Sequence, residues 1–267
     1  MDDTEIKWLI ALLLAAAAAA ATWFFWDGTK QPTMEPAPVT EAPVEDSEPA
    51  EPLYPVEPLS VEPGDGELVE LPPLEESDSY FALALIDLFG PELATLLAEE
   101  ALIDKTVASV DNLTRSRVAE KIRPVGRLSG NFIVSAAGDN GPFYLSPDNY
   151  DRYRPLVDMV TAADLDNVVS TYRRFYPLMQ EAFTQLGYPD AYFNDRVIAV
   201  IDHLLATPEP EEPIRLLQPH VLYQFADPAL EALSSGQKLL IRMGPDQAAQ
   251  IKGFLTDLRT RIAQPRR

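Results

Sequence analysis

An apolar run from Ile6 to Trp26 constrains what the N-terminal part of the chain can form. The run carries one charge, Lys7, and as a helix rising about 1.5 Å per residue it spans about 30 Å, the thickness of a hydrocarbon core. Its last residues, Trp23 to Trp26 (WFFW), are of the kind that favours a membrane interface. We therefore expect residues 1–30 to form a short tail and a transmembrane helix that contacts the lipid bilayer through residues 6–26.

A cleavable secretory signal peptide is the alternative interpretation, because the alanines at 15–21 offer small-residue cleavage positions. Two observations favour an uncleaved anchor. The residues before the run include Asp2, Asp3 and Glu5, whereas a signal peptide begins with net positive charge. Cleavage would also leave the aromatic residues at 23–26 exposed at a soluble N-terminus.

Residues 31–79 contain eleven prolines, fourteen acidic residues and neither Lys nor Arg. This composition cannot form a packed core, so we expect a disordered linker that proline keeps extended. At roughly 3 Å per residue, the linker would reach on the order of 100 to 150 Å when stretched. The other interpretation, a docking ligand for a proline-binding module, is less favoured because the segment lacks the flanking basic residues that many such ligands carry.

The placement of Lys and Arg predicts the orientation in the membrane, because these residues resist translocation. Lys7 and the terminal amine precede the apolar run, Lys30 follows it, and no further basic residue occurs before Lys105. Nothing in this long segment opposes export. We predict a single-pass protein of the bacterial inner membrane, with a cytoplasmic N-terminus and a periplasmic C-terminal domain.

Residues 80–267 have the composition of one mainly α-helical domain. The chain has a formal net charge of −21, of which the linker supplies the largest part, and the C-terminal domain is only mildly acidic. A nucleic-acid partner is not expected, since it calls for a clearly basic domain or face.

Apolar residues at three- and four-residue steps predict helices over residues 164–186 and about 191–206. Pro177 lies inside the first of these and predicts a kink near Arg173. Further helices are expected at 79–89, from 91, at 104–120, after Pro147 with an interruption near Pro155, after Asp227 as a cap, and from 245. Residues 131–135 and 143–145 flank a Gly-Asp-Asn-Gly turn and predict a small β-hairpin.

Two long stretches resemble a family of proteobacterial single-pass membrane proteins known as domain of unknown function 3014. They are residues 175–208 (FYPLMQEAFTQLGYPDAYFNDRVIAVIDHLLATP) and, within residues 218–245, VLYQFADPALEALSSGQKLLIRMGP. The resemblance covers roughly Tyr80 to Ile262 and includes the order of anchor, Pro/Glu-rich region and C-terminal domain. The family has no established activity, so the resemblance implies no catalytic residue.

Recognisable motifs for catalysis or cofactor binding do not occur in the sequence. The chain has no cysteine and two histidines, so no metal site is expected, and neither a phosphate-binding loop nor a nucleophile motif is found. We expect no cofactor and assign no catalytic residue.

Three polar groups are the candidates for binding. The first is a face of the helix at 191–206 that carries Asp195, Arg196, Asp202 and His203; it is a surface site or, more simply, a solvated face with local pairs. The second could form one buried network near the C-terminal helices, although Asp227 is also a helix cap. Its members are Gln218, His220, Asp227, Gln237, Lys238 and Arg242. Convergence of Arg196, His203, His220 and Arg242 in one concavity would indicate a small-molecule or glycan site.

The third group is a basic cluster, made of Arg115, Arg117, Lys121, Arg123 and Arg127. Such a cluster can contact lipid phosphates or an acidic partner, and the simpler interpretation is a solvated helix end. Two functions remain open. The preferred one is a non-enzymatic module that binds an envelope protein or a cell-wall component. The alternative is a cell-wall or glycan hydrolase with two carboxylates drawn from Glu181, Asp195 and Asp202.

Overall fold

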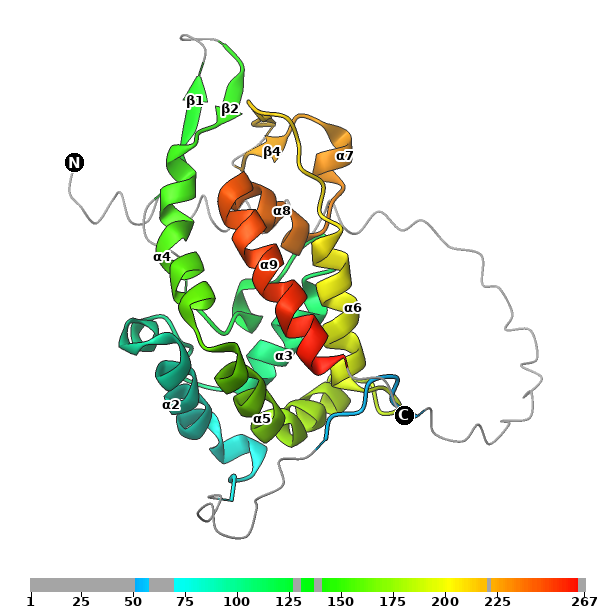
Figure 1. Cartoon of the computed structure of the whole chain (residues 1–267). Coiled ribbons are helices and arrows are strands. Elements are labelled where there is room, and N and C mark those ends of the chain that lie inside the picture. The colour runs from blue at the N-terminus through cyan, green and yellow to red at the C-terminus, as the bar shows by residue number, and fades with distance from the viewer. Residues whose placement is uncertain (1–50, 58–69, 127–130, 137–140, 220–221, 264–267) are drawn as a thin grey trace, which may run out of the picture. The chain divides into compact units, whose positions relative to one another are not determined.

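The computed structural model describes residues 51–57, 70–126, 131–136, 141–219 and 222–263 (Figure 1). The expected anchor at residues 6–26 and most of the expected linker lie outside these ranges. A membrane-spanning helix would have to be long and apolar, and no helix among the described residues meets both requirements.

The described part of the chain is mainly helical, as the periodicity predicts. Its α-helices are α2 (Asp78–Phe89), α3 (Leu102–Asn112), α4 (Asp148–Ala162), α5 (Leu165–Gln185), α6 (Phe193–Leu205), α7 (Pro228–Glu231), α8 (Ser235–Met243) and α9 (Pro245–Ile262). Short 3₁₀ helices occur at Leu74–Glu76, Pro91–Thr95 and Glu120–Ile122.

The helices pack in a layered arrangement in which α9 contacts both α4 and α6, and α3 contacts α5 and α6 (Figure 1). The largest apolar cluster lies between α2, α3 and α5. Its centre includes Val107 on α3, and the rings of Phe81 and Phe175 lie 5.0 Å apart there. Apolar area removed from water in this way stabilises the helices by packing rather than by their intrinsic propensity.

The predicted hairpin is confirmed as β1 (Val134–Ala136) and β2 (Phe143–Leu145), which pair antiparallel. The sheet continues beyond the hairpin, because β2 pairs with β3 (Arg215–Leu217) and β3 pairs with β4 (Gln224–Phe225). All three pairings are antiparallel, in the order β1-β2-β3-β4. The buried side of the sheet packs on Ile241 of α8.

The helix expected at 104–120 is shorter than predicted, since α3 ends at Asn112. The carbonyl of Leu113 accepts a bond of 3.0 Å from the backbone N–H of Gly236, and that of Arg115 accepts one of 2.7 Å from Ser235. These carbonyls at the end of α3 therefore meet the N-terminal N–H groups of α8. The N–H groups of Ser235 and Gly236 are among those that a helix N-terminus leaves without an intrahelical partner.

The interruption expected near Pro155 does not occur, because α4 runs through it from Asp148 to Ala162. Pro155 lies on the exposed side of α4, while Tyr153 and Val157 on either side of it are buried. Water can bond the carbonyl that the proline frees, and packing holds both flanking turns. Pro177 likewise lies inside α5 without ending it.

The folded domain begins before Tyr80, in residues that the composition assigned to the linker. Leu74 is 4% exposed within the main apolar cluster, and Ser77 is buried. Helix α2 begins at Asp78 rather than after a Ser79 cap. The carboxylate of Asp78 instead accepts bonds from the N–H groups of Ala101 (2.7 Å) and Leu102 (2.6 Å), and thereby caps α3.

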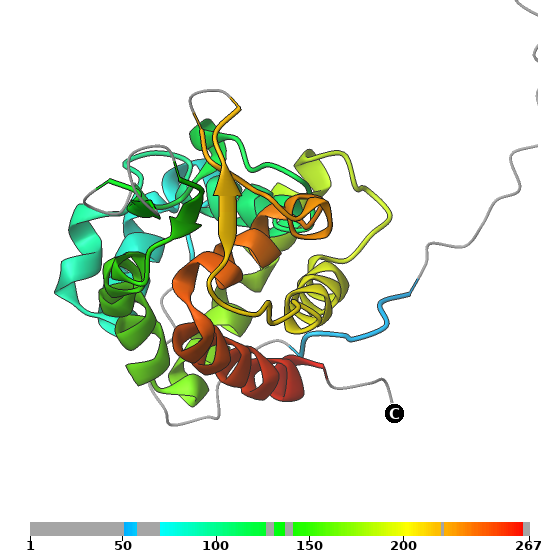
Figure 2. The same ribbon diagram turned by 90° about the horizontal axis from the view of Figure 1, so that it is seen from above.

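Residues 51–57, which we call the strap, were also expected to lie free in the linker. The strap lies beside the C-terminal end of α9, and Figure 2 shows it there in blue beside the red helix. Its Tyr54 packs against an apolar cluster that includes Ile262 at the end of α9. This part of the Pro-rich segment is therefore placed by contacts with the helical domain.

Candidate functional site

Two of the candidate arginines meet at one buried carboxylate, that of Asp111 near the end of α3. Helix α3 turns one face into the core, with Leu102, Ile103 and Val107 fully buried. Asp111 follows Val107 by four residues, so it extends the same face and is 3% exposed. A carboxylate buried to this degree needs partners of opposite charge and hydrogen-bond donors.

Arg196 of α6 supplies most of these partners. Its Nε donates to Asp111 Oδ1 at 2.8 Å, and its Nη2 donates to the Asp111 carbonyl at 2.6 Å and to Thr114 Oγ1 at 2.7 Å. The guanidinium thus joins α6 to the end of α3. Such a multidentate arrangement uses the fixed fork of arginine, which lysine cannot reproduce.

Arg115 and Tyr188 complete this arrangement, which we call the Asp111 cluster (Asp111, Thr114, Arg115, Tyr188 and Arg196). Arg115 Nη2 donates to Asp111 Oδ2 at 3.1 Å and to the Tyr188 hydroxyl at 3.3 Å. The Tyr188 ring is fixed by stacking on Phe183, with ring centroids 4.6 Å apart. The Arg115 side chain remains 57% exposed, so the cluster presents a guanidinium at the surface.

His203, further along α6, contacts the N-terminus of α8 instead. Its Nε2 lies 2.8 Å from Ser234 Oγ, and its backbone carbonyl accepts a bond of 3.2 Å from the side chain of Gln237. Ser234 and Gln237 also form a reciprocal capping box at the start of α8. Gln237 and His203 therefore join α6 to α8, which is a structural use of both side chains.

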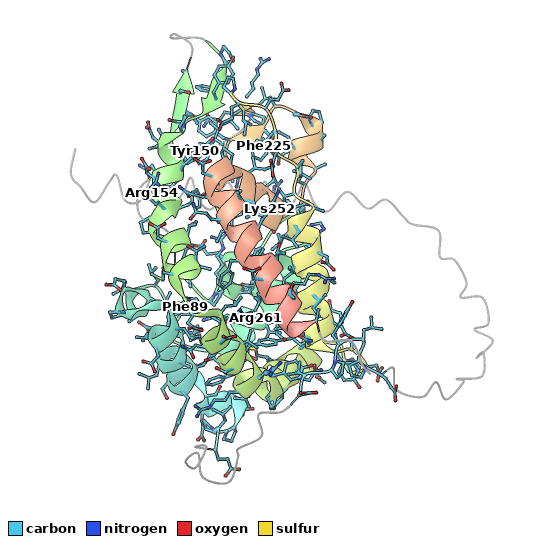
Figure 3. The ribbon with its side chains drawn as sticks, viewed as in Figure 1. Phe89, Tyr150, Arg154, Phe225, Lys252 and Arg261 are labelled. Carbon is cyan, nitrogen blue, oxygen red and sulfur yellow. The ribbon has the colours of Figure 1, made fainter. Side chains whose placement is uncertain are left out.

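Three further members of the second group lie around α7 and β4. Lys238 Nζ bonds Glu231 Oε1 at 3.0 Å, and the guanidinium of Arg242 lies 5.5 Å from the centre of the ring of Phe225, which is labelled in Figure 3. Asp227 caps α7 through a 2.8 Å bond from the N–H of Ala229, as predicted. Lys238 and Arg242 thus meet at one place, because the N–H of Phe225 donates to Glu231 Oε2 at 2.9 Å, whereas Gln237 bonds His203.

The four residues whose convergence would have indicated a small-molecule site are not brought together by these contacts. Arg196 contacts α3, His203 contacts the start of α8, and Arg242 contacts β4. His220 lies outside the described residues. The helix face that carries Arg196 and His203 is not a solvated face with local pairs either, since the bonds of both lead to other elements.

The basic cluster is divided in a similar way. Arg115 turns toward Asp111, whereas Arg117, Lys121 and Arg123 are exposed in the irregular segment around the 3₁₀ helix at Glu120–Ile122. The segment is a loop rather than a helix end, because α3 ends at Asn112. Arg127 lies outside the described residues. Three exposed basic side chains in one loop can contact an anionic surface.

The carboxylates considered for glycan hydrolysis have three different sets of partners. Asp195 accepts from backbone N–H groups of the strap, Asp202 pairs with Arg259 (2.9 Å from Nη2 to Oδ2), and Glu181 is exposed on α5 with Gln185 as a hydrogen-bond partner. Nothing in these contacts pairs two of the carboxylates across a cleft. Among the described residues, no group of three acidic or histidine side chains could hold a metal ion.

Asp111 and Asn194 are buried polar residues that the sequence analysis did not single out. Each occupies a position on the apolar stripe of its helix, Asp111 four residues after Val107 and Asn194 four residues before Ile198, and each is buried. A polar residue on an apolar stripe is the signal that could have identified both, because burial there requires a hydrogen-bond partner.

Comparison with known proteins identifies the family. Residues 102–259, from the start of α3 into the last turns of α9, match the family model described as protein of unknown function (DUF3014). No curated protein and no solved structure matches the chain. The match covers more than half of the sequence and includes the Asp111 cluster and the α6–α8 contacts. The chain therefore belongs to the DUF3014 family.

Proposed function

We propose that the protein is a single-pass protein of the bacterial inner membrane, whose periplasmic helical domain is a non-enzymatic interaction module for an envelope protein or a cell-wall component. The order of segments in the sequence carries this proposal: an apolar run at 6–26, an acidic Pro-rich segment, and a folded domain. The apolar run is long enough to cross a bilayer, and the acidic segment offers nothing that opposes export.

We place the contact surface away from the polar side chains that join the helices to one another. Arg196, His203 and Lys238 are engaged in bonds that join one helix or turn to another. The exposed residues Arg117, Lys121 and Arg123 are the proposed contact surface for an anionic partner.

Membrane topology is tested by cysteine labelling in intact cells, because the chain contains no cysteine of its own. Thr4→Cys precedes the apolar run, and Gln250→Cys lies on the exposed side of α9. A membrane-impermeant maleimide is expected to label Gln250→Cys after the outer membrane is opened, and Thr4→Cys only after full lysis. Ala248→Cys is the matched control, since Ala248 is 8% exposed and should label only after unfolding. Labelling at position 4 before that at position 250 would reject the orientation.

The contact surface is tested separately by a photo-crosslinking residue at Lys121 in cells. A discrete crosslinked product is expected there and not from the same residue at Thr256, an exposed position on α9. Loss of the product in an Arg117→Glu, Arg123→Glu background would assign it to the basic loop. No product at Lys121 above the Thr256 background would reject this surface.

A further inference from the structure

Two side chains in the first turn of α6 bond the main chain of the strap. Asp195 Oδ2 accepts from the N–H of Leu53, and Asp195 Oδ1 accepts from the N–H of Tyr54, both at 2.9 Å. Asn194 Nδ2 donates to the carbonyl of Tyr54 at 2.8 Å. The two neighbouring side chains therefore bind two consecutive N–H groups and the carbonyl that follows them.

The side chain of Asn194 is also held by residues outside the strap. It is fully buried, its Oδ1 accepts from the hydroxyl of Tyr172 at 2.9 Å, and its Nδ2 also donates to the carbonyl of Ile262 at 3.2 Å. Helices α5 and α9 thus hold the amide whose second hydrogen serves the strap. A polar side chain oriented by its neighbours in this way is a preorganised binding group.

The side chains of the strap contribute unequally. Tyr54 packs on the apolar cluster formed by Val169, Ile198, Ile201 and Ile262, whereas the side chain of Leu53 is 70% exposed. The next residues of the strap line a small surface pocket, formed by Pro55, Val56, Glu57, Tyr172, Arg173 and Ile262. The contact therefore favours a large apolar side chain at the position of Tyr54 and tolerates other side chains at the position of Leu53.

The strap sequence suits this mode of recognition. Pro52 and Pro55 enclose Leu53 and Tyr54, and proline restricts both itself and the residue before it to extended conformations. Little conformational entropy is then lost when the segment is bound. The N–H groups of Leu53 and Tyr54, which lie between the two prolines, both donate to Asp195. Main-chain hydrogen bonds combined with a packing site for one side chain are typical of extended-peptide recognition.

We propose that Asn194 and Asp195 form a peptide-binding site for an extended Pro-X-Tyr-Pro segment, which residues 52–55 of the same chain occupy as an internal ligand. The site accepts the same sequence from a separate peptide once the internal copy is removed. This proposal goes beyond the proposed function and does not depend on the membrane anchor or on the basic loop.

Residues 52–55 bind the site from within the same chain, so their effective concentration there exceeds that of an added peptide. Residues 58–69 connect the strap to the described part of the domain that begins at Glu70. For a short flexible connection the effective concentration is on the order of millimolar. A free peptide therefore competes poorly with the wild-type chain. The test must vacate the site first.

The experiment uses the full chain with residues 51–57 replaced by a Gly/Ser segment of equal length, and a fluorescent peptide of residues 50–58 (AEPLYPVEP). Fluorescence anisotropy is expected to show saturable binding to this variant and at least about tenfold weaker binding to the wild-type chain. A peptide methylated on the nitrogens of Leu53 and Tyr54 is expected to bind at least about tenfold more weakly, because it lacks both donors to Asp195. The matched control is the Leu53→Ala peptide, which should bind within about twofold of the parent because the Leu53 side chain is exposed.

Two outcomes overturn the proposal when circular dichroism shows that the Gly/Ser variant is folded. One is the absence of parent-peptide binding up to a few millimolar, and the other is equal binding of the methylated peptide. If the variant does not fold, hydrogen exchange on the wild-type chain tests whether the strap detaches from the domain without global unfolding. Exchange of the Leu53 and Tyr54 amides through a local opening, at lower free energy than global unfolding, supports a separable ligand. Exchange only through global unfolding makes the strap an integral part of the fold and overturns the proposal.

Discussion

The carboxylate of Asp111 and the guanidinium of Arg196 form an ion pair with a 2.8 Å bond between Oδ1 and Nε, although the two residues are 85 positions apart. The Asp111 side chain is 5% exposed and that of Arg196 is 29% exposed. The pair connects α3 to α6 at the point where α3 ends. Removing one member leaves the other partly desolvated without its counter-charge, which is the costly case for buried ions.

Asp111→Asn is expected to destabilise the folded domain by about 2 to 4 kcal/mol, less than for a fully buried pair because both arginines retain some water. Arg115→Met should cost less than about 1 kcal/mol, since Arg115 is mostly exposed. The measurement is the free energy of unfolding in urea. Asp151→Asn, which breaks an exposed pair with Arg154, is the control and should have no measurable effect. Equal effects of Asp111→Asn and the control would contradict this account.

Gly236→Ala is expected to destabilise the contact between α8 and the end of α3 by about 1 to 3 kcal/mol. A Cβ atom at position 236 would lie 2.6 Å from Leu204 Cδ2 and 3.0 Å from the Leu113 carbonyl, which also accepts the Gly236 N–H. Gly253→Ala in the middle of α9 is the matched control, because a Cβ atom there meets nothing within 4 Å. It should stabilise by about 0.5 to 1 kcal/mol. Thermal and urea unfolding of the two variants would show opposite shifts, and shifts of the same sign would argue against close packing at Gly236.

The folded domain is expected to lose stability as the pH rises from about 10 to about 12. Burial raises the pKa of Tyr176 to about 12, whereas an unfolded tyrosine titrates near pH 10. The unfolded chain therefore releases the proton first, and the stabilising contribution that is complete below pH 10 is lost as the pH passes through the folded-state value. Burial raises the pKa of Tyr172 as well, so its effect has the same direction.

Tyr176→Phe should make the decline between pH 10 and 12 less steep, because phenylalanine has no proton to release. Urea unfolding at several pH values gives the slope, and tyrosinate absorbance gives the titration of the folded chain. A slope identical to that of the wild type would show that Tyr176 ionises alike in both states.

Leu74→Ala tests where the folded domain begins. Leu74 is 4% exposed in the main apolar cluster, so its truncation should cost about 2 to 4 kcal/mol. Leu83→Ala on α2 is the control, because Leu83 is 62% exposed and should change stability by less than about 0.5 kcal/mol. If the two variants were equally stable, residues 71–77 would belong to the linker after all.

The sequence by itself determined the local elements of this domain. The apolar steps at 164–186 and 191–206 correspond to α5 and α6, and the turn signal between 135 and 143 predicts the β1–β2 pair. Asp227 was identified as a helix cap from its position before Pro228. These features were predictable because the period of side chains, the turn and the cap each depend on residues that are close in the chain.

The tertiary structure decided where the polar side chains go. Arg196 and His203 lie on one helix, yet they contact α3 and the start of α8, and Asp195 binds the strap more than 140 positions away. The end of α3, the addition of β3 to the hairpin and the docking of residues 51–57 follow in the same way from long-range partners. Local periodicity says which face of a helix is buried, but only the packing of whole elements brings a particular donor to a particular acceptor, because that bond requires both to lose water at the same place.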